Sequence, residues 1–334
     1  MRDRPAVPLR RPAVTLGVDL GGTGIRYARV TADGRLIGRP VAAPVTDRRR
    51  PAVVAQLRAV VDSACAGAGA VSAVGVGVPG FIRRDRGVVV SSPNFPDWRD
   101  VPLRRLLQRG VAVPLILEND ANAAALGEAW LGAGRGERGL LVMLTLGTGV
   151  GGGLVLDGAL LSGRDGMAGE IGHQTVDPDG PLCGCGNRGC LEAYASVTGL
   201  VANYRRRAGR GGEDLSGEEL ARRARQGDLR ARQAFADMGW ALGITLANLI
   251  NLLNPGRIVL GGGLSGAWRL FIGRVTQEIA RRAIRPSARG VAIRRATLGS
   301  SAGMIGAARA AWGAAPPRVQ AARGGGRTTS RAAG

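Results

Sequence analysis

One imidazole and three thiols lie close together near the middle of the sequence. They belong to His173, Cys183, Cys185 and Cys190, with glycines between the cysteines. This soft donor set suits a tetrahedral zinc ion, and the glycines let the backbone fold sharply around it. Four protein ligands leave no open position for water, so we predict a structural zinc site. The alternative is a loop of reduced cysteines. The distant Cys65 is interpreted as a buried thiol.

Two carboxylates flank this loop. Glu170 precedes His173 by three positions, and Glu192 follows closely after Cys190. Carboxylates accept pairs of hydrogen bonds from neighbouring hydroxyl groups, so a metal-braced loop carrying Glu170, His173 and Glu192 could recognise a sugar. The alternative for Glu192 is a solvated residue at the start of a helix.

Asp120 is the candidate for general-base chemistry. It follows Asn119 where the apolar segment 113–117 ends and alanine-rich sequence begins. The carboxyl end of a strand, beside a helix N-terminus, is where α/β proteins usually bind ligands. An aspartate there can accept the proton of a hydroxyl that attacks a phosphoryl group. A helix N-cap is the alternative role for this side chain.

Three glycine-rich turns follow strand-like segments. They are Asp19-Leu20-Gly21-Gly22-Thr23-Gly24, residues 146–153, and Gly261-Gly262-Gly263. Turns without side chains bring backbone N–H groups close to phosphate oxygens, and the third turn is expected to open a helix whose N-terminus favours an anion. The lysine of a P-loop is missing, which excludes that motif. Together the turns predict a nucleotide triphosphate held by two halves of the molecule, and purely structural turns are the alternative.

The elements that must position these residues follow an α/β pattern. The strand, glycine turn, strand arrangement occurs twice, as a loose internal echo. Apolar residues spaced mostly three or four apart predict a long core helix that ends at Asn254-Pro255-Gly256. The expected strands are 14–20, 25–31, 73–78, 113–117, 140–146, 150–156, 257–260 and 291–296; the expected helices are 51–65, 102–108, 121–131, 229–253, 264–284 and 302–312.

The composition of the chain restricts the class of protein to which it can belong. The chain has 334 residues and a formal net charge of +21, and its 46 basic residues are all arginine. Aromatic residues make up only 4%, so stacking on bases has little support and we expect no nucleic-acid partner. We find no apolar run of about 18 residues and no export signal, which predicts a cytoplasmic protein without a membrane span. Residues 1–13 and 315–334 are expected to be disordered.

The order of these motifs resembles the repressor, open-reading-frame and kinase (ROK) family, and within it the bacterial glucokinases. The resemblance covers about residues 14–313, and its most specific part is the loop with one histidine and three cysteines. It also rests on the glycine turns, on Glu118-Asn119-Asp120-Ala121-Asn122 and on Ala168-Gly169-Glu170-Ile171-Gly172-His173. It implies an actin-like ATPase (ribonuclease H-like) fold, with two α/β domains around a central cleft. The first domain would span 14–119 and include the last helix, 302–312; the second would span 120–301, with its zinc loop at 173–190.

The resemblance also implies an activity and a role for each motif residue. ATP would phosphorylate glucose to glucose 6-phosphate, with Asp120 as the catalytic base, and His173 would bind both the sugar and Zn²⁺. The implied sugar ligands are Asn94, Asn119, Asp120, Glu170, His173 and Glu192. The implied surroundings of the phosphates and Mg²⁺ are Asp19, Gly21, Gly22, Thr23, Thr148 and Gly149, with Gly262 and Gly263 on the adenosine side. The implied zinc ligands are His173, Cys183, Cys185 and Cys190.

The sequence departs from the family pattern at two places. Gly24 and Arg26 stand where many relatives have a lysine, which leaves the charge partner of the phosphates open. Family repressors carry an N-terminal helix-turn-helix, whereas about thirteen residues precede the first strand here, so a DNA-binding repressor is disfavoured. Kinases for N-acetylmannosamine, mannose, fructose or allose, a non-catalytic sugar sensor, and polyphosphate as donor are the alternatives. The resemblance suggests a homodimer or homotetramer.

Overall fold

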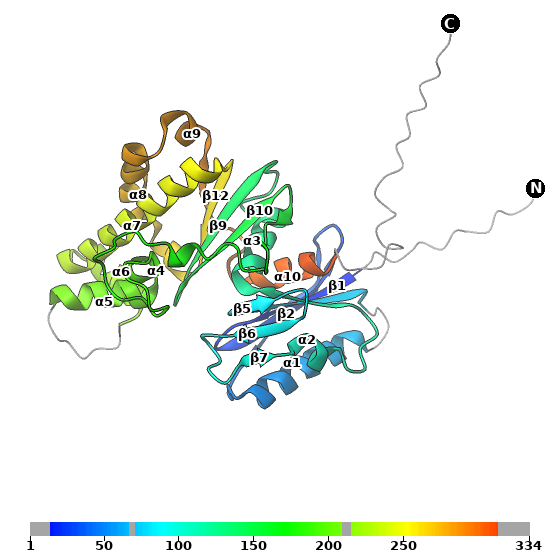
Figure 1. The fold of residues 1–334 in the computed structure, drawn as a ribbon. Helices are drawn as coiled ribbons and strands as arrows, with labels where there is room; N and C mark the ends of the chain where they lie inside the picture. The colour runs from blue at the N-terminus through cyan, green and yellow to red at the C-terminus, as the bar shows by residue number, and fades with distance from the viewer. Residues whose placement is uncertain (1–13, 67–70, 209–214, 313–334) are drawn as a thin grey trace, which may run out of the picture.

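The computed structural model describes residues 14–66, 71–208 and 215–312 (Figure 1). The segments 1–13 and 315–334, for which disorder was expected, lie outside the described residues. The described chain forms two lobes, each built on a five-stranded mixed sheet with helices packed against it. This arrangement confirms the predicted α/β class.

The two large sheets share one topology. In each, an antiparallel hairpin is followed by two parallel strands, which explains why the strand, glycine turn, strand pattern occurs twice in the sequence. The first sheet has the order β3-β2-β1-β4-β8 and the second has the order β11-β10-β9-β12-β13. The first comprises β1 (Val14–Leu20), β2 (Gly24–Thr31), β3 (Leu36–Pro44), β4 (Ala73–Val78) and β8 (Leu115–Asn119); the second comprises β9 (Leu140–Leu146), β10 (Val150–Leu156), β11 (Ala159–Leu160), β12 (Arg257–Gly261) and β13 (Ala292–Arg295).

Helices cover the outer face of each sheet because that face carries the larger apolar side chains. Leu16 and Val18 of β1 belong to one buried cluster with Leu57 of α1. Val142 of β9 belongs to another with Leu246 of α7. The outer helices of the first lobe are α1 (Arg50–Cys65) and α2 (Leu103–Gln108); those of the second are α4 (Glu192–Ala195), α5 (Val197–Ala208), α6 (Gly217–Arg225), α7 (Leu229–Leu253), α8 (Trp268–Arg282) and α9 (Arg285–Gly290).

A small third sheet lies in the first lobe and has no counterpart among the expected elements. It consists of β5 (Phe81–Arg83), β6 (Val88–Ser91) and β7 (Arg99–Val101), in that order. The loop between β6 and β7 carries Asn94. The rings of Phe95 and Trp98 stack in this loop with centroids 5.0 Å apart and are fully buried, so they anchor the segment around Asn94.

Two helices, α3 (Asp120–Leu131) and α10 (Ala302–Trp312), lie between the sheets (Figure 1). Ala124 and Leu126 of α3 share a buried cluster with Leu141 and Met143 of the second sheet. The backbone of α10 lies directly on the first sheet. A Cβ added to Gly17 or to Gly75 would come within 1.9 Å or 1.8 Å of an α10 carbonyl oxygen. The last helix therefore packs on the first lobe.

The contact between α3 and α10 predicts a strong effect of Gly306→Ala. A Cβ at Gly306 would lie 1.5 Å from the carbonyl oxygen of Ala123, so the helices would have to separate. We expect the free energy of unfolding to fall by about 3 kcal/mol or more. The control is Gly273→Ala in α8, where, beyond the helix's own backbone, no atom of the described residues lies within 4 Å of the added Cβ. That change should stabilise the protein by about 0.5–1 kcal/mol. Urea unfolding checks both variants, and wild-type stability of Gly306→Ala would contradict the close packing.

Helix α7 was expected as a core helix, and its environment agrees. It is the one helix in the described residues that is long and apolar enough to cross a membrane, with a mean hydropathy of 1.2. Length and composition alone give that result, and core helices of globular proteins meet the same criteria. Phe235, Met238, Leu242 and Leu246 are fully buried against the second sheet and its helices. The apolar stripe is thus accounted for by packing within the lobe.

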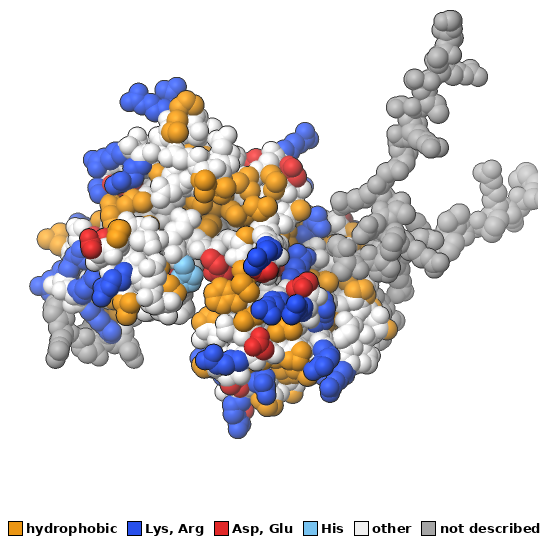
Figure 2. All heavy atoms as spheres, in the orientation of Figure 1, with side chains coloured by type: hydrophobic (Ala, Val, Ile, Leu, Met, Phe, Trp, Pro, Cys, Tyr) orange, Lys and Arg blue, Asp and Glu red, His pale blue; other side chains and the backbone are white. Residues whose placement is uncertain are grey.

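Figure 2 shows the surface indented between the two lobes. Arginine side chains are scattered over both lobes on the face shown and do not form one continuous patch. The net charge of +21 is therefore spread over this face of both lobes.

Candidate functional site

Asn119 and Asp120 occupy the junction between β8 and α3. Asn119 is the N-cap of α3: its Oδ1 accepts the N–H groups of Ala121 and Asn122 at 2.9 and 3.0 Å. Its side-chain amide donates to the carbonyl oxygen of Gly80 at 3.0 Å. Asp120 begins the helix, and its Oδ1 accepts the Ala121 N–H at 2.9 Å. The N-cap role considered for Asp120 therefore belongs mainly to Asn119. Among the described residues, none donates a hydrogen bond to Oδ2 of Asp120.

Carboxylates from both lobes gather around Asp120. Protein surrounds Asp120 on most sides, and this burial raises the pKa of its carboxyl group above the ordinary value. Burial, and then the charge of Asp120, raise the pKa of Asp19 to about 7. Burial also raises the pKa of Glu170, with a contribution from the charges of Asp120 and Glu192. The ends of β1 and β8 and the loop around residue 170 thus meet at one strongly acidic place.

Asp19→Asn is expected to stabilise the ligand-free protein at neutral and alkaline pH. The folded state holds Asp19 protonated up to about pH 7, whereas the ordinary pKa is 3.8. Between these values the folded state binds more protons than the unfolded state, so the free energy of unfolding falls as pH rises. Asparagine carries no charge, so the gain should be small near pH 4 and reach about 4 kcal/mol near pH 8. Urea unfolding across this range checks the prediction, and a gain that does not change with pH would contradict it.

Glu192 is tied to the second glycine turn. It begins α4, as the solvated-residue alternative required, but its Oε2 accepts the N–H of Val150 at 2.9 Å. Gly149 is needed beside it, because an added Cβ would lie 2.5 Å from that carboxylate oxygen. The side chain is therefore held in place between the turn and the cysteine loop. Its proposed contact with a sugar stays a prediction.

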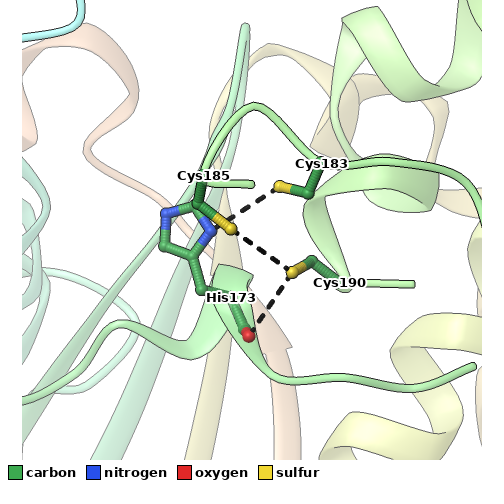
Figure 3. Close-up of side chains that lie close together, drawn as sticks. All are labelled: His173, Cys183, Cys185 and Cys190. Carbon is green, nitrogen blue, oxygen red and sulfur yellow. Dashed lines mark hydrogen bonds between the residues drawn. The ribbon is translucent and has the colours of Figure 1, made fainter. Parts of the chain in front are cut away.

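His173 and the three cysteines converge on one point (Figure 3). The Cys183 sulfur lies 3.8 Å from Nδ1 of His173, the Cys185 and Cys190 sulfurs lie 3.7 Å apart, and all four ligand atoms lie within 4.8 Å of one another. Ligands of a tetrahedral zinc at about 2.0–2.3 Å are separated by roughly 3.5–3.8 Å, so this donor set fits zinc. Cys183 and Cys190 are buried, and Asn187 donates to the Cys190 sulfur at 3.5 Å. The geometry favours a metal site over a loop of free thiols.

The glycine turns have close neighbours within their own lobes. In the first lobe, a Cβ at Gly22 would lie 2.9 Å from the side-chain nitrogen of Asn94, so this proposed sugar ligand touches the first turn. In the second lobe, Gly262 has φ +80° and lies against Leu146, where an added Cβ would be 2.4 Å from the carbonyl oxygen. The third turn therefore adjoins the second, which contains Thr148 and Gly149.

The expected helix after the third turn begins later than predicted. A 3-10 segment, Gly263–Ala267, follows Gly262, and α8 begins only at Trp268. The glycines 261–263 therefore do not open an α-helix, and the expectation of a helix N-terminus at this turn was wrong. A short 3-10 turn still presents backbone N–H groups, but the dipole of α8 begins one turn further along the chain.

Glu118 and Arg84 form a network that the sequence reasoning missed. Glu118 is buried, and its Oε1 accepts the Asn119 N–H at 3.1 Å and the Asn122 side-chain amide at 3.2 Å. The guanidinium of Arg84, in the turn between β5 and β6, lies 3.4 Å from Oε2. The i, i+4 spacing of Glu118 and Asn122 was a usable signal, whereas Arg84 is too far away in sequence to be assigned. The network braces the residues on either side of Asp120.

Two α/β lobes of like sheet topology, each with glycine turns after its strands and joined through paired central helices, define a nucleotide-binding protein of the actin-like ATPase fold. Residues 15–313 match the ROK family. The chain belongs to that family.

The similar proteins include both glucokinases and a transcriptional regulator. The glucokinase of Thermotoga maritima is 40% identical over 278 residues, 79% of this chain and 86% of that protein. The crystal structure of a ROK family glucokinase from Streptomyces griseus, in complex with glucose and AMPPNP, is 37% identical with a TM-score of 0.75 and covers 90% of this chain and 100% of that one. A crystal structure of a ROK family transcriptional regulator, a homologue of the Escherichia coli MLC protein, is 27% identical with a TM-score of 0.79 and covers 89% of this chain and 77% of that one.

Proposed function

We propose that this protein transfers the γ-phosphoryl group of ATP to the 6-hydroxyl of glucose. The observation that carries the proposal is the convergence on Asp120 of carboxylates from both lobes, beside the braced loop of Glu170, His173 and Glu192. The substrate pair is supported by the glucokinase relatives, one of which has been solved with glucose and an ATP analogue.

Asp120 is proposed to accept the proton of the attacking hydroxyl. Its Oδ1 is fixed by the Ala121 N–H, which leaves Oδ2 for the sugar. As the glucose oxygen bonds to the γ-phosphorus, its proton moves to Asp120 and the bond to the bridging β,γ-oxygen breaks, so that ADP leaves. Burial raises the pKa of this carboxyl group, and a base with a pKa closer to neutral takes up a proton more readily.

The two glycine turns are proposed to hold the phosphates from opposite lobes. Gly21, Gly22 and Thr23 would approach from β1, and Thr148 and Gly149 from β9, with Gly262 and Gly263 toward the adenosine. Asp19 suits Mg²⁺, because its buried carboxylate is disfavoured as a lone charge and carboxylate oxygens are preferred magnesium ligands. When bound, Mg²⁺ would offset charge on the phosphate oxygens.

The zinc ligands are proposed to orient the sugar side of the site. His173 faces Cys183 with Nδ1, so Nε2 is left to donate to a sugar hydroxyl. Zinc supplies rigidity here, since four protein ligands complete its coordination. Glu170 and Glu192, at the two ends of the loop, would accept hydrogen bonds from further hydroxyls, together with Asn94 and Asn119.

One assay shows whether the protein is a sugar kinase or a sugar-sensing regulator, since kinases and a regulator are both among its relatives. Purified protein is mixed with ATP, Mg²⁺ and glucose, and ADP release is followed by a coupled reaction. Sugar-dependent ADP release supports the kinase. Glucose binding without ADP release would identify a sensor and overturn the proposal. The same assay with mannose, fructose, allose, N-acetylmannosamine and polyphosphate ranks the acceptors and the donor.

We also propose that the enzyme acts in the cytoplasm, where its ATP is available, and as a homodimer or homotetramer. Light scattering coupled to size-exclusion chromatography measures the assembly, and a monomer over the working concentration range would refute it.

A further inference from the structure

A cavity lies beside the zinc loop, and it is lined by none of the residues proposed above for sugar, nucleotide or zinc. Its volume is about 470 Å³, within the range of sites for small molecules. The zinc loop and α4 form one wall, and α5 and α7 form the other. The lining residues are Asp177, Asp179, Gly180, Pro181, Arg188, Tyr194, Arg206, Arg207, Asp237 and Trp240.

An aromatic pair forms part of this lining. The rings of Tyr194 and Trp240 meet edge to face, with centroids 5.6 Å apart and an interplanar angle of 70°. The hydroxyl of Tyr194 donates to Oδ2 of Asp177 at 2.7 Å, which fixes that ring against the loop. Trp240 is only partly buried, so part of its surface is open to a ligand. The C–H groups on the face of a pyranose ring form an apolar surface that packs well on such a ring.

Positively and negatively charged side chains line the cavity in equal number. Its three arginines are matched by three aspartates, and Arg207 and Asp237 form an ion pair at 2.6 Å. Arg188 donates to a backbone carbonyl, and Arg206 donates to an asparagine side chain. Within the described part of the chain, neither of these two arginines has a carboxylate partner within 4 Å. They can therefore donate to a ligand, while Asp179, which is exposed, can accept from one.

This balance selects against strongly anionic ligands. A nucleotide or a phosphate ester entering the cavity would meet carboxylates as well as guanidinium groups, so its charge would not be fully offset. A neutral ligand with many hydroxyl groups can use both signs, since hydroxyls accept from arginine and donate to aspartate. Paired donors and acceptors beside a partly open aromatic ring are the features of a site for carbohydrate.

We propose that this cavity binds a neutral carbohydrate, separately from the sugar that is phosphorylated. The site adjoins the zinc loop: Arg188 lies between the proposed zinc ligands Cys185 and Cys190, and Tyr194 follows Glu192 by two residues. A carbohydrate held there contacts the loop that carries His173 and Glu192, so its binding is linked to glucose binding.

The test uses maltose as the probe and glucose 6-phosphate as the charged comparison. Binding to the full-length zinc-loaded protein is followed by calorimetry and by tryptophan fluorescence, since Trp240 lines the cavity. We expect saturable maltose binding that Arg206→Gln and Asp179→Asn each weaken by about tenfold. Arg230→Gln, an exposed arginine outside the cavity, is the matched control and should bind maltose normally. Glu170→Gln, which alters the catalytic sugar site, should also leave maltose binding unchanged.

Three results would overturn the proposal. They are the absence of saturable maltose binding, equal weakening by Glu170→Gln and Arg206→Gln, and tighter binding of glucose 6-phosphate than of maltose at the cavity. Arg206 and Asp179 are exposed, so their variants are expected to fold, and zinc content confirms that each loop is intact. Because binding is measured directly, the result is independent of whether the protein releases ADP.

Discussion

Asp120→Asn is expected to lower kcat by about 10³-fold while glucose affinity stays within a few-fold of the wild type. Asparagine has the same shape, and its side-chain oxygen can keep the 2.9 Å hydrogen bond from the Ala121 N–H. It cannot accept the proton of the sugar hydroxyl. Removing a charge also relieves the repulsion that raises the pKa of Asp19, so the variant should be at least as stable as the wild type.

Steady-state kinetics and calorimetric titration with glucose measure the two effects separately. The matched control is Asp165→Asn, which removes an exposed carboxylate whose one ion-pair partner among the described residues is the exposed Arg164. The control should keep its activity, since exposed pairs contribute little. Near-normal turnover of Asp120→Asn would show that another group is the base. A parallel loss of glucose binding would assign Asp120 to binding alone.

Cys190→Ser is expected to remove the zinc and to weaken glucose binding at least tenfold. Cys190 is fully buried, its sulfur lies 3.7 Å from that of Cys185, and its backbone pairs with Thr175 across the loop. Serine is a poor ligand for zinc, so the loop would lose the ion that fixes His173 and, two residues after Cys190, Glu192. Losing this support should shift KM for glucose by about 10–100-fold and lower the melting temperature markedly.

Elemental analysis should find about one zinc per wild-type chain and close to none in Cys190→Ser. Cys65→Ser is the matched control, because Cys65 lies in α1 of the other lobe, where it packs against apolar residues and is partly buried rather than fully buried as expected. It should retain the zinc and the KM. Prolonged treatment with a strong chelator should reproduce the effect of Cys190→Ser on the wild type, and added zinc should reverse it. Fully active protein that contains no zinc would exclude the metal site.

Most strands and helices could be predicted because their residues alternate or repeat around a buried face. The strand 14–20 and the helices 229–253 and 302–312 begin and end where predicted. Strand β3 was missed because nearly all of its side chains are exposed, so its sequence carries no pattern of burial. Helix α6 did carry a signal, since Ser216 caps it by accepting the Glu219 N–H. The strand before Asp120 extends to Asn119 because Glu118 is buried there with partners, which an isolated charged residue in a sequence does not reveal.

The site could be predicted where its residues are close in sequence. The four residues of the candidate zinc site span 18 positions, and their types alone predict a metal site. Contacts between distant segments were out of reach of pattern reasoning. Examples are Asn94 against Gly22, which depends on the small third sheet, and Arg84 beside Glu118. The sequence also did not show which of Asn119 and Asp120 caps the helix, since either side chain could do so.

The position of α10 has a consequence for biosynthesis. The inner face of the first sheet presents Gly17 and Gly75 to a helix that is nearly the last part of the described chain. While the ribosome is still translating the second lobe, that face lacks the cover of α10, although strands β1 to β8 have already emerged. The amino-terminal half therefore cannot reach its final packing during translation, and a nascent chain halted before codon 302 should bind chaperones and be cleaved readily by proteases.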